Sequence, residues 1–125
     1  MFEVSVENSF SGGHALRGYQ GKCENPHGHN YKVQVTVAGD AVNNMGLLVD
    51  LKVLKSAMNQ AIDRLDHQYL NDIEPFREVN PSTENIARHL YRIINTSLNL
   101  ETGVSIRLKK VRVWETSTSY ATYFE

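Results

Sequence analysis

Residues 23–29 read Cys-Glu-Asn-Pro-His-Gly-His, and the rest of the chain is organised around this stretch. His27 and His29 are two residues apart, so on an extended backbone their side chains lie on the same face. Two imidazoles on one face can supply two ligands of a metal ion. Cys23 can be a further ligand, a small buried side chain, or a nucleophile or base, and the sequence leaves these alternatives open.

Alternating apolar and polar side chains predict a strand on each side of this stretch. The alternation runs from residue 2 through residue 14 and again over residues 31–37, and a period of two is typical of a half-buried strand. Antiparallel pairing of the two strands would bring His14 towards His27 and His29. Three imidazoles suit Zn²⁺ and leave a fourth position for water or substrate. The alternative is three loop histidines that bind no metal.

Two helices are predicted in the middle of the chain. Asp50 is a good N-cap, and the apolar residues after it follow helical spacing, which predicts a helix over about 51–65. Ser82 or Thr83 can cap a second helix, whose apolar stripe runs over residues 86–98.

Two further strands are expected near the C-terminus. Val104, Ile106 and Leu108 alternate, and residues 111–113 continue with the opposite parity, which indicates a bulge at residues 109–110. Residues 119–124 can form the last strand. The order ββααββ predicts an α+β fold, an antiparallel sheet with two helices on one face. The other face and the sheet edges must be covered or solvated, so we expect an oligomer.

The composition indicates one domain over residues 1–125 with a formal net charge of −1. Charges of both signs are mixed along the chain, so nothing indicates a surface for nucleic acid or an anionic membrane. No apolar run reaches the ~18 residues that span a bilayer. The N-terminal residues follow a strand pattern rather than that of a signal peptide, and the single cysteine fits a reducing cytoplasm.

Two other places carry charged residues with more than one interpretation. Asp66-His67 follows a helix end. In one interpretation, His67 is protonated and complements the helix dipole. In the other, His67 is a catalytic base whose protonation the Asp66 carboxylate sets. Glu115 falls in phase with an apolar strand. It is either an outward-facing residue just past the strand end or a buried carboxylate that binds two parallel N–H donors of a planar heterocycle.

Four segments resemble the signature of the 6-pyruvoyltetrahydropterin synthase superfamily, in the family's order. They are residues 23–31, 65–72, 81–85 and 113–116. Within the superfamily the chain looks most like the 6-carboxy-5,6,7,8-tetrahydropterin synthase branch, which serves queuosine (7-deazaguanine) biosynthesis. Three residues separate Cys23 from His27, as is usual there, whereas the pyruvoyl-forming branch typically has a longer gap. A third branch has glutamate in place of this cysteine.

The resemblance implies a tunnelling fold, in which sheets from several subunits close into a barrel. It implies a homohexamer of two stacked trimers, with sites at subunit interfaces. It also implies roles for eight residues. The zinc ligands are His14, His27 and His29; the proton-transfer set is Cys23, Asp66 and His67; the pterin contacts are Glu115 and Thr83.

The implied substrate is 7,8-dihydroneopterin triphosphate, and the implied products are 6-carboxytetrahydropterin, acetaldehyde and triphosphate. The alternatives are pyruvoyl formation without carbon–carbon cleavage, an unrelated zinc hydrolase, and a non-enzymatic zinc-binding protein. The chain departs from the family pattern twice. Ala15 stands where an arginine is common, with Arg17 as a possible substitute, and Ser82 stands where threonine is frequent.

Overall fold

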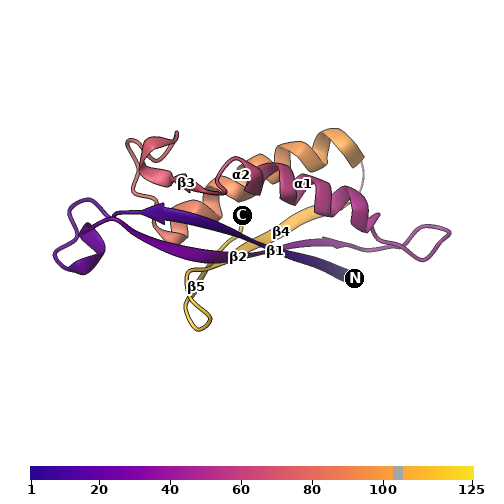
Figure 1. Cartoon of the computed structure of the whole chain (residues 1–125). Coiled ribbons are helices and arrows are strands. Elements are labelled where there is room, and N and C mark those ends of the chain that lie inside the picture. Colours follow the sequence, from indigo (N-terminus) through magenta and orange to yellow (C-terminus); the bar gives the residue numbers. More distant parts are fainter. Residues whose placement is uncertain (103–105) are drawn as a thin grey trace.

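The computed structural model describes residues 1–102 and 106–125, in one sheet and two main helices (Figure 1). In chain order the elements are β1 (Phe2–His14), η1 (Lys22–Glu24), β2 (His27–Gly39), α1 (Leu51–Asp63), β3 (Gln68–Tyr69), η2 (Leu70–Asp72), α2 (Thr83–Thr102), β4 (Arg107–Trp114) and β5 (Tyr120–Tyr123). The two η elements are single turns of 3-10 helix.

The sheet has the order β3-β1-β2-β4-β5. β1 and β2 pair antiparallel over their whole length, from Phe2 opposite Gly39 to His14 opposite His27, which confirms the predicted pairing. β3 adds a short parallel pairing with Gly12 and Gly13 of β1. The sheet is therefore mixed rather than antiparallel throughout. The sequence did not predict β3 because two residues are too few to show a period.

β4 contains the predicted bulge. Thr36 pairs with Lys110 and Val37 with Leu108, so Lys109 is the extra residue. Because a bulge shifts side-chain parity by one, the residues on either side of it can both face the core. Val104, which was expected to open this strand, lies outside the described residues.

The helices begin at their predicted caps. The Asp50 carboxylate accepts the Lys52 N–H at 2.9 Å before α1, and the Ser82 hydroxyl accepts the Asn85 N–H at 3.2 Å before α2. α1 ends at Asp63 rather than about residue 65, and the turn that follows leads directly into Asp66-His67. That shorter helix matters for the site described below.

The core lies between the two helices and one face of the sheet, while the described residues place no helix over the other face (Figure 1). The side chains that meet there are buried and apolar. They include Leu54, Met58 and Ile62 of α1, Ile86, Leu90 and Ile94 of α2, and Val33, Val35 and Val37 of β2. Each full burial of this kind stabilises the fold by ~1.5–3 kcal/mol. No helix in the described ranges is long and apolar enough to cross a membrane.

Candidate active site

Three histidines lie together at one end of the β1–β2 pair, as the antiparallel pairing predicts. His14 is directly opposite His27, and His29 is opposite Gly12. The ring centroids are 4.4 Å apart for His14 and His27, 5.1 Å for His14 and His29, and 5.0 Å for His27 and His29. The alternation of β1 and β2 turns all three rings to the helix side of the sheet.

Glu115 joins the three histidines. It follows the end of β4, and its backbone N–H donates to the Ser119 carbonyl at 3.0 Å. Its Oε1 lies 3.3 Å from Nε2 of His14 and 3.1 Å from Nε2 of His29. All four residues offer ligand atoms within 4.8 Å of one another. Glu115 is thus just past the strand end, as one interpretation expected, but its carboxylate turns inward.

The hydrogen bonds of the imidazoles fit a metal ion. Nδ1 of His14 donates to the Pro81 carbonyl at 2.6 Å and Nδ1 of His27 to the Asn25 carbonyl at 2.8 Å, because a carbonyl can only accept. Such outer bonds leave each Nε2 with a lone pair for a metal. Nε2 of His14 is buried, has no hydrogen-bond donor among the described residues, and faces the Glu115 oxygen. Two acceptors in contact repel unless a cation lies between them.

The electrostatics favour the metal-binding form of His29. Burial lowers the pKa of this imidazole, and the neighbouring His14 and His27 lower it further, although Glu115 acts in the opposite direction. A neutral imidazole is the form that binds a metal. Three imidazoles and a carboxylate are a donor set that suits zinc.

Two asparagines hold the chain that follows His14. The Asn71 side chain accepts the Ala15 N–H and donates to the Ala15 carbonyl, both at 2.9 Å. Asn80 makes the same pair of bonds with the backbone of Arg17, also at 2.9 Å. Each side-chain amide therefore makes the pair of backbone hydrogen bonds that a neighbouring strand would make. This fixes where β1 ends and hence where His14 lies.

The Arg17 side chain is bonded to backbone carbonyls. Its guanidinium donates to the Phe76 carbonyl at 2.7 Å and to the Asn71 carbonyl at 3.3 Å. The side chain thus fastens the loop to the segment after β3, and Ala15, in the position where the family commonly has an arginine, is buried.

We expect Asn71→Ala to lower the free energy of unfolding by about 2–4 kcal/mol. Two hydrogen bonds are lost, and the buried N–H and carbonyl of Ala15 remain without partners. Asn80→Ala is the matched control, because solvent can replace its bonds to Arg17, which are exposed. It is expected to cost only about 0.5–1.5 kcal/mol. Equal losses in urea unfolding would contradict the buried role of Asn71.

Cys23 lies in η1, outside the metal group of His14, His27, His29 and Glu115. Its carbonyl accepts the Leu16 N–H at 2.8 Å, which ties the middle of the loop to its start. Its side chain is half-buried. The described structure therefore does not place the thiol among the metal ligands or in the core.

Asp66 and His67 form a pair fastened to β1. Oδ1 of Asp66 accepts the Ser11 N–H at 3.0 Å, and the His67 N–H donates to the Ser11 carbonyl at 2.6 Å. Nδ1 of His67 lies 3.0 Å from Oδ2 of Asp66. The bond from Ser11 lowers the pKa of the Asp66 carboxyl, and the His67 contact lowers it further. His67 has a φ of 60°, a strained value for a residue other than glycine.

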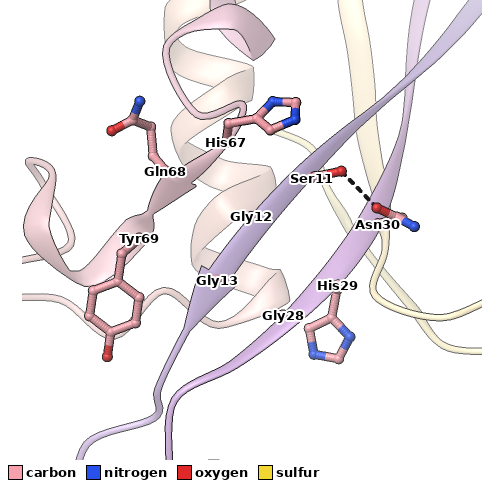
Figure 2. A pocket seen from close by; sticks show the side chains of 9 residues that line it. All are labelled: Ser11, Gly12, Gly13, Gly28, His29, Asn30, His67, Gln68 and Tyr69. Atoms are coloured by element: carbon pink, nitrogen blue, oxygen red, sulfur yellow. Dashed lines mark hydrogen bonds between the residues drawn. The ribbon is translucent and has the colours of Figure 1, made fainter.

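The His67 ring borders an open hollow of about 480 Å³ on the β1–β2 pair. Figure 2 shows the side chains of His67 and His29 pointing away from each other, on either side of the Ser11–Asn30 hydrogen bond. The His67 side chain is 80% exposed. One chain thus assembles the three histidines with Glu115, and holds Asp66-His67 apart from them.

Thr83 and Glu115, the two predicted pterin contacts, border one further hollow of about 380 Å³, together with Ser119 and Tyr120. Thr83 is buried at the start of α2. Glu115 therefore lies between this hollow and the histidine nitrogens.

Tyr31 is a site residue that the sequence reasoning missed. Its ring lies edge-on to His14 and His29, with centroids 5.9 Å and 5.4 Å apart, and stacks on Phe10 at 4.9 Å. Burial raises the pKa of its phenol, and the charge of Glu115 adds to that. A signal was available, because residue 31 continues the parity of residues 27 and 29.

The fold and the site together define an α+β protein with a centre that can hold a metal ion. A family model described as 6-pyruvoyl tetrahydropterin synthase matches residues 3–125. A 6-carboxy-5,6,7,8-tetrahydropterin synthase from Haemophilus influenzae is 34% identical across 100% of both chains. The human 6-pyruvoyl tetrahydrobiopterin synthase is 38% identical, with 97% of this chain and 90% of the human one covered.

A solved structure agrees with these sequence matches. Caenorhabditis elegans 6-pyruvoyl tetrahydropterin synthase superposes with a TM-score of 0.85 at 30% identity, over 100% of this chain and 97% of its own. The chain therefore belongs to the 6-pyruvoyl tetrahydropterin synthase family, as its four segments predict, and the expected fold is confirmed. The relatives named here are tetrahydropterin synthases, so this is a family of enzymes.

Proposed function

We propose that residues 1–125 form a single-domain 6-carboxy-5,6,7,8-tetrahydropterin synthase of the cytoplasm. It would convert 7,8-dihydroneopterin triphosphate and water to 6-carboxytetrahydropterin, acetaldehyde and triphosphate. The observation that carries the proposal is the cluster of three histidines and Glu115 in a member of this family. Both branches occur among the relatives at similar identity, so identity does not decide between them. The short spacing from Cys23 to His27 favours the carboxytetrahydropterin branch.

The proposed metal is zinc, held by His14, His27 and His29. When bound there, zinc would act as a Lewis acid on the side-chain oxygens of the substrate. The carbonyls of Pro81 and Asn25 keep two of these imidazoles in the required tautomer.

Glu115 and Thr83 are proposed to bind the pterin ring. The hollow that they border would take the ring, and the carboxylate would accept its two parallel N–H groups once it turns from the histidine nitrogens. The substrate side chain would then reach towards the histidines.

Cys23, Asp66 and His67 are proposed to move protons. Cys23, as thiolate, would remove a carbon-bound proton next to the ring. Asp66 would hold His67 by Nδ1 and leave Nε2 for proton transfer. Because the His67 ring is exposed and points away from His29, we propose that it serves the site of a neighbouring subunit. The proposed assembly is a hexamer of two stacked trimers, whose barrel would enclose the sheet face over which the described residues place no helix.

We expect His67→Asn to lower kcat by about 10²–10⁴-fold with zinc content and subunit number unchanged, because only a positioned acid–base group is lost. Steady-state kinetics with elemental analysis would measure this. His89→Asn is the matched control, since His89 packs on Phe76 from α2, away from the site. Full activity of the His67 variant would contradict the catalytic role and favour the alternative, in which Asp66-His67 only stabilises the helix end.

Product identification tests the proposed reaction. Zinc-loaded protein would be incubated anaerobically with 7,8-dihydroneopterin triphosphate, and the pterin product identified by mass. Carboxytetrahydropterin with acetaldehyde is the expected result. A pyruvoyl product would move the chain to the other branch, and no turnover by a zinc-loaded oligomer would overturn the proposed substrate.

A further inference from the structure

Tyr31 carries a hydroxyl that the fold buries without a partner. Its side chain is 0% exposed, and no described residue forms a hydrogen bond with its Oη. A buried hydroxyl that has lost its bonds to water destabilises the folded state, whereas phenylalanine would fill the same space without this cost. We therefore infer that the hydroxyl has a hydrogen-bond partner in another state of the site.

The polar groups around Tyr31 belong to the metal group. The ring lies edge-on to His14 and His29, the two histidines whose Nε2 atoms the Glu115 carboxylate contacts. Oε1 of Glu115 lies against the two histidine nitrogens. Its other oxygen forms no hydrogen bond within the described part of the chain, and a carboxylate oxygen can accept one from a phenol.

We propose that Tyr31 is a positioning residue: in the protein without pterin, one oxygen of Glu115 holds a metal ion together with the three histidines, and the Tyr31 hydroxyl donates a hydrogen bond to that carboxylate. Carboxylates at metal sites are commonly held by such outer hydrogen bonds, which orient them and raise the affinity for the metal. The inference rests on the metal-binding part of the proposed function and not on the identity of the pterin product.

The stability of the metal-free protein gives the first test. Tyr31→Phe is expected to melt at the wild-type temperature or above, because it removes a hydroxyl that has no partner. Tyr91→Phe is the matched control, since the Tyr91 hydroxyl donates to the Leu108 carbonyl at 3.2 Å. That variant is expected to melt lower. A clear fall in the melting temperature of Tyr31→Phe would show a structural hydrogen bond and overturn the proposal.

A double-mutant cycle on zinc affinity gives the second test, by competition with a chromophoric chelator. Tyr31→Phe is expected to weaken zinc binding about 10–100-fold, whereas Tyr91→Phe leaves it unchanged. In the Glu115→Ala background the Tyr31 substitution should have no further effect. Alanine is used because a glutamine oxygen could still accept from the phenol. Unchanged affinity in Tyr31→Phe or in Glu115→Ala, or additive losses, would overturn the proposal.

The cycle separates this inference from the proposed reaction, because it needs no pterin. Coupling between Tyr31 and Glu115 in a protein that does not convert the dihydropterin would overturn the reaction alone. Normal conversion without coupling would overturn the role of Tyr31 alone.

Discussion

Cys23→Ala is expected to lower turnover of the dihydropterin triphosphate by about 10²–10⁴-fold, while the fold and the bound zinc are retained. The thiol lies outside the group of three histidines and Glu115, so its loss removes no ligand of that group. Its carbonyl, which fastens the loop to Leu16, is present in any variant. Single-turnover kinetics, zinc analysis and a melting curve would test the three parts of this expectation.

The neighbouring Glu24→Ala is the matched control for Cys23. Glu24 lies in the same 3-10 turn, and its N–H bond to the Gly21 carbonyl belongs to the backbone. It is expected to keep wild-type turnover. Loss of zinc in Cys23→Ala would make the thiol a ligand, and full turnover with zinc retained would remove Cys23 from the proton-transfer set.

The histidine cluster was predictable because two long strands with a period of two can pair in few ways. Their alternation places residues 14, 27 and 29 on one face, and the structure confirms this. The position of Glu115 was predicted only in part from the sequence. Its phase with Val111 and Val113 indicated the inward face, but the backbone bond to Ser119 across the turn, which holds it just past the strand end, was not predictable.

The polar contacts between distant segments were not predictable. Asn71 binds the backbone of Ala15, and Asp66 binds that of Ser11, both across more than fifty residues. Hydrophobic periodicity gives the face of a residue, not its hydrogen-bond partner. Asp66 reaches Ser11 from the turn that follows α1, and the boundaries of an element are the part that sequence specifies least.

His14→Ala is expected to weaken zinc binding by more than about 100-fold and to abolish turnover. His14 is the fully buried member of the cluster, and its Nε2 faces Glu115. Loss of an outer partner alone weakens a metal site about 10–100-fold, so loss of a ligand should exceed this. Free zinc at about 100 times its Kd should stabilise the wild type by about 2.7 kcal/mol. Thermal melts with and without zinc would show no such gain for His14→Ala.

Truncation of His14 also leaves the Pro81 carbonyl without its donor, so stability and metal binding must be separated. His14→Asn places an amide N–H near the position of Nδ1, where it can donate to that carbonyl, but lacks the imidazole lone pair at Nε2, so it should lose zinc with a smaller loss of stability. His89→Ala removes a half-buried ring elsewhere and should melt lower while still gaining stability from zinc. A His14 variant that still gains the full stabilisation would show that zinc binds elsewhere in the protein, and the three-histidine centre would then be wrong.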